Sequence, residues 1–210
     1  MNQAIIFDCE YLTVEGAMRR QWCGPLDPDP SVVQIGAVKL SLDPGFEISG
    51  TFQVLIRAKD RFGANAGLDP YFTELTGIGQ QAVDREGIGL AEALERFDRF
   101  SEGANFWSWG KDELSLLAIG CYVEGIAPPI QTHRFGNASG LLLNAGMPYA
   151  DLQKTTSGQL ADYFQIEGSP RRHHDALDDA MSIALTLRYL LSAGRLHPRD
   201  FKLPLLIAKP

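Results

Sequence analysis

The sequence is poor in features that mark secreted, zinc-bound or membrane proteins. Its three cysteines, Cys9, Cys23 and Cys121, are far apart and form no CxxC motif, so neither a disulfide framework nor a structural zinc site is indicated. No stretch approaches the roughly 20 apolar residues that a membrane-spanning helix needs. The first eight residues do not resemble a secretory signal. We therefore expect free, at least partly buried thiols, a cytoplasmic location and no membrane partner.

Basic side chains are also scarce. The 19 Lys and Arg residues are outnumbered by 26 Asp and Glu residues, which gives a formal net charge of -7. This balance argues against a protein that coats long duplexes, because such binding needs many contacts from Lys and Arg to phosphate. An enzyme that grips a few terminal nucleotides through bound cations tolerates an acidic surface, since the cations supply the positive charge.

Apolar residues, in contrast, are abundant enough for one well-buried core. The chain has 210 residues, of which 45% are hydrophobic and 21% charged. This length favours a single domain. We expect residues 1–195 to form it and residues 196–210 to be a C-terminal tail that packs on or extends it.

The hydrophobic pattern predicts strands first and then an alternation of strands and helices, which favours a mixed α/β sandwich. Residues 13–31 contain a run rich in Pro and Gly and are expected to form a loop. Strands are predicted at residues 4–7, 32–40, 50–57 and 105–109, and helices at residues 90–102, 112–123 and 175–191.

Two acidic residues follow the first apolar run. Asp8 and Glu10 are two positions apart, so alternation along a strand turns both carboxylates to one face and Cys9 to the other. Two like charges this close favour a bound cation, and carboxylates are preferred ligands of hard metal ions. A solvated strand end would also explain the pair.

A third acidic position opens the helix at residue 112. At helical spacing Asp112 shares a face with Leu116 and Ile119, whereas Glu113 turns away from them. We therefore predict that Asp112 is the inward carboxylate. Helix capping, or a favourable charge in the first turn, is the alternative role for Asp112.

The strongest signal is the segment RRHHDALDDA at residues 171–180. Asp179 lies about 60° to 70° from the centre of the apolar stripe of the helix that follows, and Asp178 lies almost opposite that centre. Asp179 is therefore predicted to face a site at the edge of the core, and Asp178 to face solvent. His174 is predicted on the loop that enters the helix. Two solvated imidazoles or a zinc site are alternatives, although no cysteine lies nearby. The predicted buried stripe is Ala176, Ala180, Ile183, Leu187 and Leu190.

In order and approximate spacing, these motifs resemble those of the DEDD exonucleases, in the branch with a histidine five residues before the last aspartate. The match covers nearly the whole domain. Residues 33–38 (VQIGAV) resemble the second strand of that family, and residues 68–78 resemble its segment ending in Leu-Thr-Gly-Ile. The Gly-Lys-Asp at residues 110–112 looks most like the RNA-trimming group that includes histone-mRNA exonucleases.

The resemblance implies a ribonuclease-H-like α/β fold, with a mixed five-stranded sheet flanked by helices. It implies that two Mg²⁺ or Mn²⁺ ions are held by Asp8, Glu10, Asp112 and Asp179, and that Glu10 and His174 are catalytic, with His174 as the general base. The implied enzyme is a 3'-to-5' exonuclease. It would release 5' mononucleotides from single-stranded nucleic acid, with RNA favoured over DNA.

Substrate contacts are expected at Cys9, Tyr11, Leu75, Ile78 and Arg172. Many relatives have a threonine where this chain has Tyr11, and an aromatic ring there can stack on a base. Leu75 and Ile78 fall where relatives wedge the last bases, and Arg172 could meet phosphate. Core packing and solvated charge are the alternative roles for these three residues.

Two other functions fit the same motifs. One is a regulatory or nucleic-acid-binding module that keeps the fold without turnover, although none of the five catalytic groups is missing. The other is an exonuclease of the same chemistry that acts on very short oligonucleotides, which the acidic composition favours. The oligomeric state leaves no pattern in the sequence.

Overall fold

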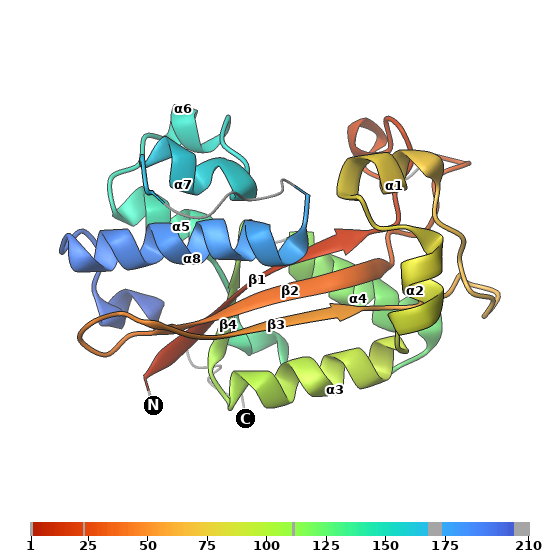
Figure 1. Ribbon diagram of the computed structural model, residues 1–210, viewed down its shortest axis with the longest axis horizontal. Helices are drawn as coiled ribbons and strands as arrows, with labels where there is room; N and C mark the ends of the chain where they lie inside the picture. Colours follow the sequence, from red (N-terminus) through yellow and green to blue (C-terminus); the bar gives the residue numbers. More distant parts are fainter. Residues whose placement is uncertain (1, 23, 111, 168–173, 204–210) are drawn as a thin grey trace, which may run out of the picture.

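Five strands form one mixed sheet, and helices cover both of its faces (Figure 1). The structure, a computed structural model, describes residues 2–22, 24–110, 112–167 and 174–203. The strand order is β3-β2-β1-β4-β5. β1 pairs with β2 in antiparallel fashion and with β4 in parallel fashion. This arrangement confirms the α/β fold of the ribonuclease-H type that the resemblance implies.

The elements follow one another along the chain in this way. The strands are β1 (Gln3–Tyr11), β2 (Val32–Ser41), β3 (Ile48–Leu55), β4 (Asn105–Ser108) and β5 (Phe135–Asn137). The α-helices are α1 (Pro70–Thr76), α2 (Gln80–Glu86), α3 (Leu90–Ser101), α4 (Asp112–Glu124), α5 (Ala138–Asn144), α6 (Tyr149–Leu152), α7 (Leu160–Tyr163) and α8 (Ala176–Ser192). Short 3-10 helices are η1 (Met18–Arg20), η2 (Thr132–Arg134), η3 (Ser157–Gln159) and η4 (Pro198–Phe201).

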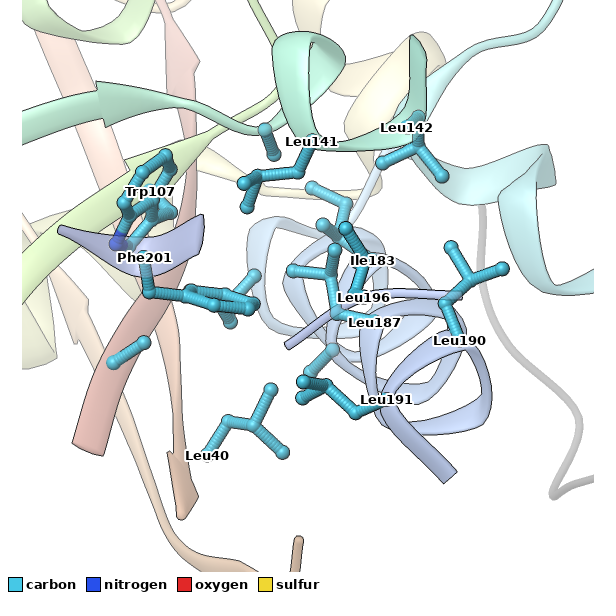
Figure 2. Packing of buried hydrophobic residues seen from close by; sticks show 14 of the residues in the cluster. Leu40, Trp107, Leu141, Leu142, Ile183, Leu187, Leu190, Leu191, Leu196 and Phe201 are labelled. Carbon is cyan, nitrogen blue, oxygen red and sulfur yellow. The ribbon is translucent and has the colours of Figure 1, made fainter. Parts of the chain in front are cut away.

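One face of the sheet packs against α8 and the small helices around it. Ala4 and Ile6 of β1 point to this face and join the buried stripe of α8. All five residues predicted for that stripe are buried. Figure 2 shows part of this cluster, in which the ring of Phe201 meets Trp107 edge to face at a centroid distance of 5.4 Å. Residues just after α8 therefore belong to the same core.

The opposite face packs against α3 and α4. Phe7 of β1 points to this side, as alternation requires. Its ring lies 5.3 Å from that of Phe97 on α3 and 6.0 Å from that of Phe106 on β4. Aromatic pairs in such tilted and edge-on arrangements add to the energy of burial. The sheet is therefore fixed between two packed layers, and β1 lies at its centre.

The predicted strands and helices are confirmed with small shifts of their ends. The sequence did not predict the short elements between residues 124 and 174, namely β5, α5, α6 and α7. These have three to seven residues each, and so short a segment shows little periodicity. No helix within the described ranges is both long and apolar enough to cross a membrane.

Candidate active site

The acidic residues meet at the carboxyl end of β1, the central strand of the sheet. β1 and β4 are parallel neighbours, so their carboxyl ends lie at the same edge. β1 brings Asp8 and Glu10 to this edge, and α4 begins just after β4. Figure 1 shows the first turn of α8 above the same end of β1. Three elements that are distant in the sequence therefore supply carboxylates to one place.

Asp8, Glu10 and Asp179 are buried together, each with 7% of its surface exposed. Asp8 and Glu10 share the face of β1 that α8 covers, and Asp179 lies in the first turn of α8. The side chain of Asp175 caps this helix by accepting hydrogen bonds from the amides of Leu177 and Asp178. The cap fixes where the helix starts and thereby where Asp179 points. Asp178 is half-buried.

His174 lies immediately before this cap and is exposed. Its backbone has a φ of +61°, which is uncommon for a residue other than glycine. Ligand atoms of Glu10, His174 and Asp179 all lie within 4.8 Å of one another. His174 thus adopts a left-handed backbone conformation on the segment that enters α8. Its imidazole lies beside the two buried carboxylates of Glu10 and Asp179.

The prediction that Asp112 faces inward is wrong. Asp112 is exposed, whereas Glu113 is buried, with only 8% of its surface exposed. The buried side of α4 is formed by Glu113, Leu116, Leu117, Gly120 and Cys121. Apolar residues occur on nearly every side of this helix, so periodicity did not identify the face that packs against α3. Glu113 precedes Leu117 by one turn and therefore shares its buried side.

The charges in this cluster raise the pKa values of its members. Burial and then the charges of Glu113, Asp179 and Glu10 hold the pKa of Asp8 well above its usual range. Burial and the charges of Asp179 and Asp175 raise the pKa of Glu10 to about 8. Burial raises the pKa of Glu113 to about 7, although the hydroxyl of Ser108 donates a hydrogen bond to its carboxylate. The ionised cluster is therefore costly without a cation.

No described Lys or Arg forms an ion pair with the carboxylates of β1, Asp8 and Glu10, or with Glu113. One carboxylate oxygen of Glu113, Oε2, is buried and accepts no hydrogen bond. Buried carboxylate oxygens in this state fit a hard divalent metal ion, which binds oxygen ligands and offsets their repulsion. The donor set therefore suits Mg²⁺ or Mn²⁺.

The residues predicted to contact substrate have different surroundings. Cys9 is buried in the core on the α3 and α4 side, so its side chain points away from the carboxylates. Tyr11 is half-buried, and its ring meets Trp22 edge to face at a centroid distance of 5.4 Å. Leu75 lies in α1 and is half-buried, and Ile78 follows that helix and is buried. Arg172 lies outside the described residues.

Besides Ser108, two neighbours of the cluster were missed by sequence reasoning. One is Glu113, which could have been identified from Leu117, because residues four positions apart lie on the same side of a helix. The other is Ser157 at the start of η3, whose hydroxyl donates to Oδ2 of Asp179 at 3.4 Å. No sequence pattern marks Ser157, since it is 22 residues before Asp179 and lies in a segment without clear periodicity.

No protein-family model and no curated protein sequence matches this chain. Solved structures do share its fold. They include a full-length 3'-exonuclease (TM-score 0.69, 21% identity), where the match covers 92% of this chain and 61% of the other. A 3'-exonuclease solved for its recognition of the histone mRNA stem-loop has a TM-score of 0.72 and 21% identity, with 92% and 83% covered. Exonuclease I of E. coli, in complex with a dA16 oligonucleotide, has a TM-score of 0.61 and 15% identity, with 96% and 42% covered. The TM-scores establish a shared fold, and sequence identities this low establish nothing beyond it. The chain spans less than two thirds of the first of these proteins.

Proposed function

We propose that this chain is a metal-dependent 3'-to-5' exonuclease that releases 5' mononucleotides from single-stranded nucleic acid. The observation that carries the proposal is the cluster of buried carboxylates from β1, α4 and α8, with the His174 imidazole at its exposed side. Clusters of this composition hold divalent ions in enzymes that cleave phosphodiester bonds. The shared fold of known 3'-exonucleases supports the same reaction class.

Asp8, Glu10 and Asp179 are the residues that would hold the metal, together with one carboxylate from the start of α4. Two divalent ions bound there would polarise the attacking water and stabilise the leaving 3' oxygen. We assign the fourth carboxylate to Glu113 rather than to Asp112, because Glu113 is buried beside Asp8 and has an oxygen without a hydrogen-bond partner.

His174 would take the proton from the attacking water. An imidazole suits this step because its usual pKa is close to neutrality. Its exposure lets it approach a substrate phosphate, and Glu10 and Asp179 lie within 4.8 Å of it to stabilise the positive charge that it gains. The backbone position next to the helix cap at Asp175 limits how far the imidazole can move from the carboxylates.

The substrate would approach along the side of the site that Tyr11 borders. Burial and then the charges of Asp112 and Glu10 raise the pKa of Tyr11, so the ring lies close to the acidic cluster. Stacking of a terminal base on such a ring is independent of sequence. We favour RNA over DNA because the Gly-Lys-Asp segment resembles that of RNA-trimming relatives.

A panel of 5'-labelled oligonucleotides tests this function. Matched single-stranded RNA and DNA 20-mers and a dinucleotide are incubated with the protein in Mg²⁺ and in EDTA. Stepwise shortening of a 20-mer in Mg²⁺ alone is the expected result. Faster cleavage of the dinucleotide would identify the enzyme as a degrader of very short oligonucleotides. Intact substrates under every condition would refute the proposed exonuclease activity and favour a nucleic-acid-binding module without catalytic activity.

A further inference from the structure

We infer that Gly36 and Gln34 of β2 are positioning residues that set how closely the first turn of α8 approaches β1. Their effect would be to fix the gap across which Asp8 and Glu10 on the strand and Asp179 on the helix share a metal ion. The inference rests on the proposed function, since it assigns these two residues a role in that same site. Neither residue carries a charge or a reactive group.

Gly36 lies directly under the start of α8. In the sheet it is the register partner of Asp8. A Cβ atom at this position would lie 2.1 Å from the amide nitrogen of Leu177 and 2.2 Å from the carbonyl carbon of Ala176. Both contacts are with backbone, which cannot rotate away as a side chain can. Any residue larger than glycine therefore pushes α8 and β2 apart beside Asp8.

Gln34 holds the same turn by a hydrogen bond. It is the register partner of Glu10 and is 4% exposed. Its Oε1 accepts a hydrogen bond of 2.9 Å from the backbone amide of Ala176. This amide belongs to the first turn of α8, where backbone N–H groups have no partner within the helix. The bond therefore ties the start of the helix to the strand that pairs with β1.

A third contact comes from β3. The side-chain amide of Gln53 donates to both carboxylate oxygens of Asp175, at 3.2 and 3.3 Å. Asp175 in turn accepts from the amides of Leu177 and Asp178, and its carbonyl accepts from the amide of Asp179 at 2.9 Å. The first turn of α8 is thus held at its cap, at Ala176 and by the close approach over Gly36.

These contacts matter for metal binding because ligand distances are narrow. Magnesium demands oxygen ligands at about 2.0 to 2.1 Å in near-octahedral geometry. A displacement of α8 by a fraction of an ångström would move Asp179 relative to Asp8 and Glu10, which are held in the sheet. If Gly36 and Gln34 served packing alone, their replacement would lower stability without changing the metal affinity of the folded protein.

The test compares Gly36→Ala with Gly50→Ala in the 210-residue chain. Gly50 is a suitable control because it lies in β3 of the same sheet, where an added Cβ would meet only Phe100 at an ordinary 3.7 Å. Binding of Mn²⁺ is measured by isothermal titration calorimetry on variants whose folding is checked by circular dichroism. We expect Gly36→Ala to bind Mn²⁺ at least about tenfold more weakly, which is the usual effect of losing a residue that orients metal ligands. Gly50→Ala should change the affinity little. Equal affinity of both variants would overturn the inference.

A second substitution keeps the inference testable if Gly36→Ala does not fold. Gln34→Met has a side chain of similar length but replaces the amide oxygen that accepts from Ala176 with a thioether sulfur, which is only a weak acceptor. We expect weaker Mn²⁺ binding and faster amide hydrogen exchange in the first turn of α8, whereas wild-type values for both would contradict the role. Mn²⁺ binding by a wild-type protein that cleaves no oligonucleotide would refute the proposed activity alone. Wild-type affinity in both variants of an active enzyme would refute the positioning role alone.

Discussion

Glu113 on α4 lies beside Asp8 on β1, and after burial its charge is the strongest influence that raises the pKa of Asp8. The neighbouring Asp112 is exposed. Under the proposed function, this relationship favours Glu113 as the carboxylate that would share an ion with Asp8. It also gives a matched pair of substitutions at adjacent positions, since each removes one negative charge and changes the shape of the side chain little.

Glu113→Gln should weaken Mg²⁺ or Mn²⁺ binding by at least about tenfold. Loss of a residue that only hydrogen-bonds to a metal ligand already lowers metal affinity by about that factor, and loss of a ligand should lower it no less. Asp112→Asn should change affinity about twofold at most, since exposed charges interact weakly through water. Calorimetric titration of both variants with Mn²⁺ measures the difference. The reverse order of effects would return the fourth position to Asp112.

His174→Ala should lower the maximal rate of cleavage by about 10²- to 10⁴-fold, which is the usual contribution of a general base. Binding of Mn²⁺ should change little if the imidazole moves protons and does not hold the metal. Single-turnover rates and calorimetric titrations of the same variant separate these roles. A large loss of metal affinity would instead make His174 a ligand, which its distance from Glu10 and Asp179 allows.

The metal-free protein should become less stable as the pH rises from about 4.5 to about 8. The pKa values of Glu10 and Glu113 are raised from 4.5 to about 8 and about 7, so the folded state binds their protons more tightly than the unfolded state does. That stabilisation is present below the unfolded pKa and is lost as the pH passes the folded pKa.

Saturating Mg²⁺ should remove this decline, because the metal binds the ionised carboxylates and releases their protons. Thermal unfolding followed by circular dichroism in EDTA and in Mg²⁺, across this range of pH, provides the measurement. The double substitution Glu10→Gln with Glu113→Gln is the control and should make the metal-free decline shallower, leaving the contribution of Asp8, whose pKa is also raised. A melting temperature in EDTA that rises with pH over this range would contradict the raised pKa values of these carboxyl groups.

Tyr11→Ala should raise the KM for a single-stranded oligonucleotide, since stacking of a base on an aromatic ring contributes about 1 to 3 kcal/mol. Tyr11→Phe keeps the ring and should retain most of the affinity, so it serves as the control. Steady-state kinetics on both variants gives KM and kcat, and thermal unfolding checks that loss of the contact with Trp22 leaves the fold intact. Equal KM values for the two variants would remove Tyr11 from the binding surface.

How far the sequence predicts the structure depends on the contrast within each element. α8 has a clear apolar stripe, so Asp179 and not Asp178 was identified as buried. Alternation in β1 likewise placed Asp8 and Glu10 together. α4 is apolar on nearly every side, and its packing against α3 and the sheet buries Glu113 and leaves Asp112 exposed. The backbone approach over Gly36 depends on the distance between two elements 140 positions apart in the sequence, which no local pattern encodes.

Release of the terminal nucleotide is the most direct test of the central claim that the carboxylate cluster is a metal-dependent 3'-to-5' exonuclease site. A single-stranded RNA labelled in its last nucleotide is incubated with wild-type protein and with Asp179→Asn, in Mg²⁺ and in EDTA. We predict that wild-type protein in Mg²⁺ releases the label first, as a 5' mononucleotide, and that the other three reactions release little. Internal fragments, release in EDTA or equal release by Asp179→Asn would contradict this account.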